Sequence, residues 1–182
     1  MLSDAAETEN VSVAYDERDL KKKGQHKING YAISDNYETV DLFITLYANT
    51  TEIRTIPKSE VDTASKMITN FFRRAVYNDY VNEIAESSEI FEFANTLANY
   101  AELRENLIRV NAFILTNGTY KGELPASQVI CGYNVYYKVI DVEYLYKISE
   151  QAGVPIELDF ENLDGHKYEI PCLAANLSNP DY

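Results

Sequence analysis

The stretch that decides the fold is INGYAISDNYETVDLFITLY, residues 28–47. Residues 28–33 and 40–47 are both apolar runs of strand length, and Ser34–Tyr37 between them has the small polar residues of a turn. Side chains in the second run alternate between two faces, with Val40, Leu42, Ile44 and Leu46 on one and Asp41, Phe43, Thr45 and Tyr47 on the other. With a further strand expected over Val11–Tyr15, these runs predict a three-stranded antiparallel meander.

Helical spacing replaces this alternation after Pro57. Ser59 is the expected N-cap of a helix that runs to about Tyr77, and the apolar residues of that helix form one stripe: Val61, Ala64, Ile68, Phe72 and Ala75. A second helix is expected after a cap at Ser88, with its apolar positions continuing to Ala101. Strands at residues 108–114 and 133–139 follow, and Asp141 caps a last helix that ends at Gly153.

This order of elements predicts an α/β (α+β) fold, in which a mixed central sheet is flanked by helices. A helical segment over residues 2–9 and an edge strand over residues 156–160 complete the prediction. Because the sequence shows neither an internal repeat nor a low-complexity linker, we expect residues 1–182 to form a single domain.

Composition narrows the functional classes. The chain has 182 residues, of which 46% are hydrophobic and 25% charged, and this balance excludes wholesale disorder. Its net charge of −13 disfavours nonspecific binding to nucleic acid, which draws its affinity from basic residues. No run is long and apolar enough to span a membrane and the start does not resemble a secretory signal, so we expect a cytoplasmic protein without a membrane partner.

Few residues carry the signature of a standard active site. Cys131 and Cys172 lie far apart with no CxxC spacing, which favours two buried thiols over a disulfide or a metal site. The basic cluster consists of Lys21, Lys22, Lys23 and Lys27. It either contacts phosphate groups beside the sheet or forms a solvated loop balanced by neighbouring acids, and we favour the second interpretation. Arg73 and Arg74 are expected at the surface.

The order of the elements points to one class of chemistry. A helix that carries a Glu, three meander strands, a long helix and another strand is the order of a restriction-endonuclease-like core. Such a site needs an acid on its second strand and an acid-x-Lys run on its third, where they hold Mg²⁺ and activate water. Many α/β domains share this order, so it indicates the fold more than the activity.

Several stretches resemble one family when they are taken in chain order: KINGY (27–31), VDLFI (40–44), FF (71–72), EIAESS (83–88), RVNAFILTN (109–117), YKVIDVEYLY (137–146) and IELDF (156–160). This ordered set, spread over about residues 5–182, resembles the N-terminal domain of the abortive-infection phage-resistance (AIPR) proteins. The resemblance implies a nuclease-like domain that precedes a larger C-terminal region, and therefore a fragment of a longer AIPR-type protein.

The family pattern, carried onto this sequence, falls on residues that are poor ligands for a metal ion. The acid of the first helix would be Glu7, and the acid of the second strand is replaced by Asn29. The acid-x-Lys run falls on Thr45 and Tyr47 with Leu46 between them, or one residue away. One carboxylate rarely holds Mg²⁺ alone. Asp35, Glu38 or Asp41 are the nearby acids that could substitute, although the first two lie in a turn. We therefore predict a degenerate nuclease fold with no metal site and no cofactor.

Three hypotheses follow. The first is a noncatalytic nuclease-like module of a phage-defence protein, acting in sensing, docking or assembly, whose partner is the C-terminal region of the parent protein or another protein. The second is a metal-dependent endonuclease with a rebuilt site, or one that needs the C-terminal region, and only this one would use Mg²⁺. The third is an α/β domain with a purely structural role. The sequence gives no oligomeric state.

Overall fold

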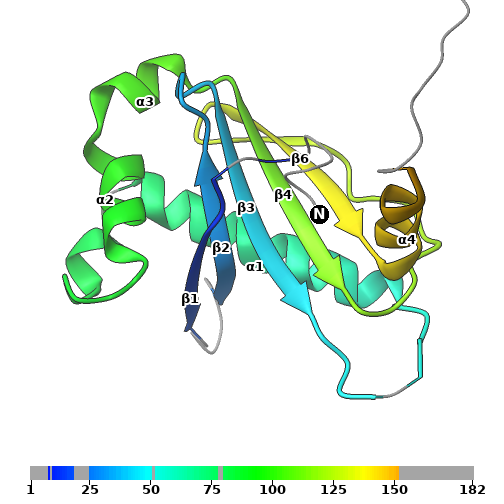
Figure 1. Ribbon diagram of the computed structural model, residues 1–182. Coiled ribbons are helices and arrows are strands. Elements are labelled where there is room, and N and C mark those ends of the chain that lie inside the picture. The colour runs from blue at the N-terminus through cyan, green and yellow to red at the C-terminus, as the bar shows by residue number, and fades with distance from the viewer. Residues whose placement is uncertain (1–7, 9, 19–24, 51, 78–79, 152–182) are drawn as a thin grey trace, which may run out of the picture. The chain divides into compact units, whose positions relative to one another are not determined.

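A computed structural model of the protein describes residues 8, 10–18, 25–50, 52–77 and 80–151. They lie in one compact unit within residues 1–152 and build a six-stranded mixed sheet in the order β1-β2-β3-β4-β6-β5 (Figure 1). The prediction of a mixed sheet flanked by helices is confirmed. Of the expected helix over residues 2–9 the structure describes only residue 8, which is not helical, and the edge strand over 156–160 and the helix end at Gly153 lie outside the described segments. The single domain over residues 1–182 stays a prediction.

The meander is confirmed. Strands β1 (Ser12–Arg18), β2 (His26–Ile33) and β3 (Thr39–Leu46) pair in antiparallel order. The first strand ends three residues beyond Tyr15, where the sequence predicted a polar loop, because Arg18 pairs with His26 and the strand passes through a bulge between Val13 and Asp16. An edge strand accepts such charged residues because one of its sides is not paired.

Helix α1 (Lys58–Val76) buries the predicted stripe, but its cap differs from the prediction. The N-cap is Pro57 and not Ser59, and no side chain caps the helix. Pro57 lies in the extended region, at φ −67° and ψ 147°, and its carbonyl accepts the backbone N–H of Glu60 at 3.0 Å. The ring of proline fixes φ near the value that a helix start needs, so the helix begins directly after it.

After α1 the chain forms a short 3₁₀ turn, η1 (Val81–Glu83), within residues 80–85, where the sequence favours a helical turn. The second predicted helix is divided into α2 (Phe91–Asn99) and α3 (Ala101–Asn106). Ser88 does not cap α2 with its side chain; its backbone carbonyl accepts the N–H of Phe91, and Ile90 is the N-cap. The predicted continuation to Ala101 is wrong because Tyr100, with ψ 107°, turns the chain between the two helices.

Strands β4 (Arg109–Thr116) and β6 (Tyr133–Ile140) extend the sheet parallel to β3. Strand β5 (Gln128–Ile130), which the sequence did not reveal, pairs antiparallel with β6 through a two-residue turn at Cys131 and Gly132. Both turn residues have positive φ, 54° and 91°, as tight hairpins require. Helix α4 (Val142–Gln151) has its predicted cap, since Asp141 Oδ1 accepts the N–H of Tyr144 at 2.8 Å.

The two faces of the sheet are covered differently (Figure 1). Helix α1 packs across one face, called here the helix face, and buries the main core there with residues such as Val40, Leu42 and Ile44. The other face, called the second face, has a smaller apolar cluster in which Phe43 stacks on Phe113 at 5.1 Å. Leu145 of α4 packs against this cluster. No helix among the described segments is long and apolar enough to cross a membrane.

Candidate functional site

The structure brings together two of the positions that the sequence assigned to a degenerate nuclease site. The side-chain oxygen of Asn29 accepts the backbone N–H of Thr45 at 2.9 Å. The regular pairing of β2 with β3 runs from Gly30 to Ile33, so this bond stands directly beside the last paired residue. Asn29 therefore acts as a substitute for a backbone acceptor that joins the two strands, and its carbonyl is already engaged by the protein.

Tyr47, the third of these positions, is 73% exposed and stands at the rim of a pocket. The pocket has a volume of about 340 Å³ and lies at the carboxyl ends of the parallel strands β3, β4 and β6. Ligands often bind at such edges. Its walls are mostly apolar, formed by Leu46, Leu115, Ile140, Val142 and Leu145. We call this hollow the strand-end pocket.

The polar residues beside the strand-end pocket serve the backbone. Asn117 donates its amide to the carbonyl of Ala48 at 2.8 Å and accepts the N–H of the same residue at 2.9 Å. These two hydrogen bonds hold the segment that follows β3 against the end of β4. A hard cation prefers carboxylate oxygens as ligands. Thr45 and Tyr47 line the strand-end pocket together with mostly apolar side chains, which supply no such oxygens.

The acids considered as replacements lie elsewhere. Asp35 and Glu38 are exposed in the turn between β2 and β3, as predicted. Asp41 is 7% exposed on the second face and accepts the amide of Asn111 at 2.7 Å. Within the described part of the chain, no three His, Cys, Asp or Glu side chains gather closely enough to hold one metal ion. Glu7 lies outside that part.

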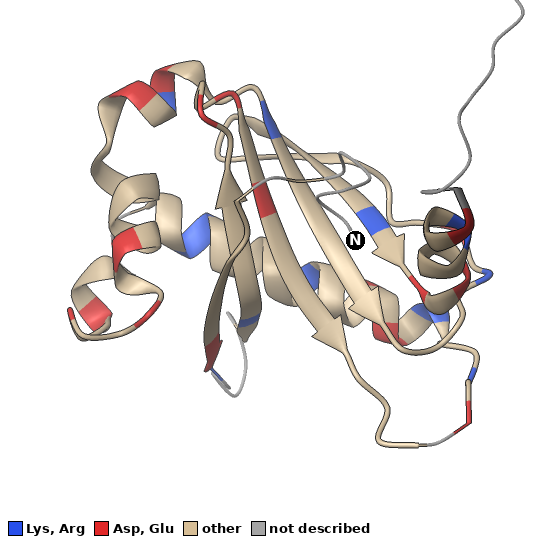
Figure 2. Cartoon of the chain, viewed as in Figure 1, with Lys and Arg blue, Asp and Glu red and all other residues tan. Residues whose placement is uncertain are grey.

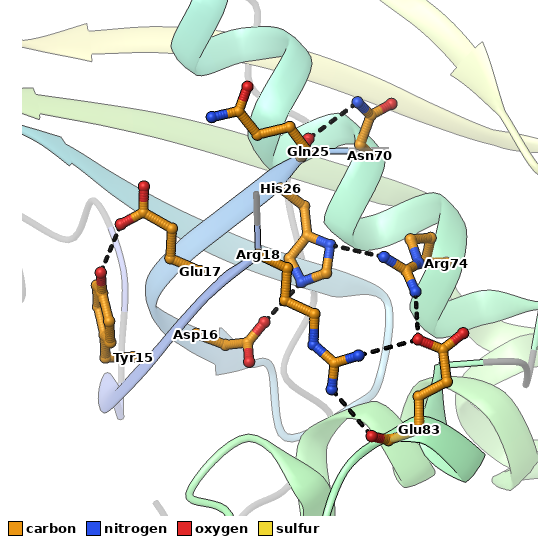
Figure 3. A network of polar contacts seen from close by, with 9 residues as sticks. All are labelled: Tyr15, Asp16, Glu17, Arg18, Gln25, His26, Asn70, Arg74 and Glu83. Atoms are coloured by element: carbon orange, nitrogen blue, oxygen red, sulfur yellow. Dashed lines mark hydrogen bonds and ion pairs between the residues drawn. The ribbon is translucent and has the colours of Figure 1, made fainter. Parts of the chain in front are cut away.

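Sequence reasoning missed a polar network that joins the edge strand to the helices (Figure 3). His26 is fully buried, and its Nε2 lies 2.6 Å from Oδ2 of Asp16. Arg74 of α1 contacts His26 Nδ1 at 3.3 Å and Glu83 of η1 at 2.6 Å, and Arg18 of β1 reaches the same Glu83 carboxylate at 2.9 Å. The prediction of a surface position is confirmed for Arg73 but wrong for Arg74, whose side chain is 19% exposed.

The donors in this network assign the proton on His26. A guanidinium only donates, so Nδ1 accepts from Arg74 and Nε2 carries the hydrogen that is donated to Asp16. An aspartate beside a histidine resembles part of a nucleophile-activating set, but that chemistry needs the other ring nitrogen to face a nucleophile. In this structure the other nitrogen faces Arg74, and the ring has no exposed surface.

Electrostatics fit a structural role for the network. Burial alone would raise the pKa of Asp16, but the hydrogen bond from His26, the nearby Tyr80 hydroxyl and the charge of Arg18 outweigh it, and the pKa lies below its usual value. Burial also raises the pKa of Tyr80, and the Asp16 carboxylate adds to that shift. His26 packs edge-on against Tyr80 at 5.1 Å. The network therefore pins β1 to α1 and η1.

Two further predictions can be placed. Of the basic cluster, Lys27 lies on β2 and faces Glu17 at 3.7 Å, which agrees with a charge-balanced surface, while Lys21, Lys22 and Lys23 lie outside the described residues.

Cys131 is half-buried in the turn before β6, and burial raises the pKa of its thiol. Reactive cysteines have lowered pKa values. Cys172 also lies outside the described segments.

Comparison with known proteins identifies a family. The family model described as "Abortive infection phage resistance protein N-terminal domain" matches residues 1–147. No curated protein and no solved structure matches the chain. The matched residues span all six strands and α1 to α3, and they include Asn29, Thr45 and Tyr47.

Proposed function

Because the chain belongs to the family of abortive infection phage resistance protein N-terminal domains, we propose that it is a noncatalytic, nuclease-like module of that phage-defence protein. It acts by docking onto a protein surface. The partner is the C-terminal region of the parent protein, since an N-terminal domain has such a region within reach of the same chain.

The single observation that carries the proposal is the chemistry of the strand-end pocket. A metal-dependent nuclease would need anionic oxygens where Thr45 and Tyr47 stand, and the pocket there is walled by leucine, isoleucine and valine. Asn29 supports the same interpretation because its carbonyl is committed to the Thr45 N–H. These positions now stabilise the strands or shape an apolar pocket.

The charge of the chain favours a protein partner over DNA. A net charge of −13 repels a polyanion, and the charged residues of the described segments are spread over helices, loops and strands (Figure 2). An apolar pocket of about 340 Å³ accommodates a side chain such as leucine or phenylalanine. The surface that fits this module therefore presents an apolar anchor with basic residues around it.

The catalytic half of the proposal is tested with the purified full chain, supercoiled plasmid and Mg²⁺ or Mn²⁺. We expect no nicking and no metal-dependent change in melting temperature. Nicking that Glu7→Ala abolishes would establish the endonuclease alternative, because Glu7 is the acid that the family pattern assigns to the first helix. Nicking that survives Glu7→Ala and co-purifies with the chain would point to a site rebuilt from other acids and would equally contradict the noncatalytic proposal.

The docking half is tested by titrating the chain with the separately purified C-terminal region of the parent protein. We expect saturable binding that Tyr47→Ser weakens about tenfold, since an exposed aromatic rim residue is a typical anchor. Tyr15→Ser is the matched control, because Tyr15 is 56% exposed but lies on the edge strand β1, away from the strand-end pocket. Absence of binding, or equal weakening by both substitutions, would contradict docking at this pocket.

A further inference from the structure

A second pocket lies on the second face of the sheet, and its chemistry differs from that of the strand-end pocket. It has a volume of about 530 Å³, within the range of small-molecule sites, and is lined by Arg109, Asn111, Phe113, Leu124, Tyr136 and Lys138. We propose that this pocket binds a small organic anion of nucleotide size, with its phosphate or carboxylate group on Arg109 and a flat ring against the apolar wall.

The register of the strands places these side chains on one face. Asn111 lies beside Tyr136 and Phe113 lies beside Lys138 in the parallel pairing of β4 with β6. Arg109 is two residues before Asn111 and so points to the same side. Strands β3, β4 and β6 carry one charged residue each, and Figure 2 shows basic positions on β4 and β6 with an acidic one on β3.

Arg109 is held ready for an anion. Its Nε donates to the side-chain oxygen of Asn111 at 2.7 Å, and its guanidinium lies over the Tyr136 ring at 4.7 Å. Asn111 is itself fixed, because its amide donates to Asp41. Among the described residues, the hydrogen bond found for the Arg109 guanidinium is the one from Nε, which leaves its two terminal nitrogens for a ligand. A planar fork fixed at its base and stacked on a ring is suited to a bidentate bond with phosphate or carboxylate.

Lys138 supplies a second cation further along the same face. Its Nζ lies 4.7 Å from the centre of the Tyr144 ring and donates to the hydroxyl of that residue at 2.8 Å. Because Arg109 lies beside Asn134 and Lys138 is four residues further along β6, the two Cα positions are separated by about 13 Å along the strands. That span is longer than a simple inorganic anion and suits an elongated molecule.

The apolar part of the lining selects the rest of the ligand. Phe113 forms the floor and Leu124, which is 49% exposed, stands at the edge on the loop before β5. A flat ring can pack against such surfaces while its anionic group reaches Arg109. The negative charge of the whole chain disfavours a long polyanion but opposes a single small anion far less.

This pocket is separate from the predicted nuclease positions. Arg109 is the first residue of β4, whereas Thr45 and Tyr47 stand where β3 ends, and the two strands run parallel. The two sites therefore lie toward opposite ends of the sheet. The inference does not depend on the noncatalytic docking role.

The test is calorimetric titration of the full chain with four probes: AMP, benzoate, adenosine and inorganic phosphate. We expect AMP to bind in the micromolar to submillimolar range, and benzoate, which keeps a ring and an anionic group but is too short to span the pocket, to bind more weakly. Adenosine lacks the anion and phosphate lacks the ring, so each should bind at least tenfold more weakly. Because the chain has no tryptophan, a change in its tyrosine fluorescence is a second readout of binding.

Matched variants locate the binding. Arg109→Gln should weaken the bound probe at least tenfold, and Arg109→Lys should weaken it too because the planar fork is lost. Arg54→Gln is the control. Arg54 is an exposed arginine in the segment between β3 and α1, where it pairs with Glu60, and it does not line this pocket. Circular dichroism verifies that each variant is folded. Failure of both AMP and benzoate to bind at about 10 mM, or equal binding by Arg109→Gln and the native chain, overturns the proposal.

Discussion

Replacement of His26 tests whether the buried network stabilises the fold through its polar bonds or only through packing. His26→Phe keeps a flat aromatic ring, somewhat larger than imidazole, between Tyr80, at 5.1 Å, and Phe71, at 5.7 Å. It removes the bond to Asp16, which is a charged acceptor, and loss of such a bond costs about 1.5–3 kcal/mol. Arg74 keeps its contact with Glu83, so the loss on that side is smaller. We therefore expect about 2–3 kcal/mol of destabilisation.

His26→Ala adds the removal of a fully buried ring. Truncating a buried aromatic residue to alanine costs roughly 3–5 kcal/mol, so the two effects together approach the 5–15 kcal/mol that stabilises a typical domain. His26→Ala should leave the chain marginally folded, whereas His26→Phe should lower the melting temperature by about 4–12 °C, at 2–4 °C per kcal/mol.

Urea unfolding at pH 7, followed by far-ultraviolet circular dichroism, measures both changes. A double-mutant cycle with Asp16→Asn isolates the bond between the two side chains, and we expect a coupling of about 1–2 kcal/mol. If His26→Phe changes the free energy of unfolding by less than about 0.5 kcal/mol, the polar bonds contribute nothing and the reasoning is wrong.

Three further predictions concern single positions. Asn29→Ala should destabilise the chain by about 1–2 kcal/mol in urea unfolding, because the Thr45 N–H loses its acceptor, and a neutral result would refute the strand-joining role. Asp16→Asn should make the free energy of unfolding less dependent on pH in acid. Because the pKa of Asp16 is lowered in the folded chain, its contribution to stability is present above its ordinary pKa near 3.8 and is lost as the pH falls below that value. An unchanged pH dependence would count against this account. Gly118→Ala should cost roughly 2 kcal/mol in the same assay, because the added Cβ would lie 2.5 Å from the Arg54 carbonyl.

The sequence predicted the elements whose pattern is regular and local. The apolar stripe of α1 is set by burial on one side of that helix, and residues 40–46 alternate between the two faces of β3, each of which packs in its own apolar cluster. Asp141 was found as a cap because its side chain performs the capping. The predictions of N-caps at Ser59 and Ser88 were wrong because neither side chain caps its helix, although serine favours that position. Strand β5 has only three residues, too few to show a pattern.

The candidate site was predictable in part. Asn29, Thr45 and Tyr47 could be located from the family pattern, but the bond between the first two required the register of β2 and β3. The network around His26 was missed because its members come from β1, β2, α1 and η1 and approach only in the folded chain. A buried histidine between an edge strand and a helix leaves no periodic signal in the sequence.

The central claim is that the positions the family pattern assigns to a nuclease site, Asn29, Thr45 and Tyr47, do not hold a divalent cation. Calorimetric titration of the full chain with Mn²⁺ measures this directly, without dependence on a substrate. We predict no saturable binding below about 10 mM, which is weaker than the millimolar sites that proteins use. A one-to-one site with micromolar affinity that Glu7→Ala removes would contradict the account.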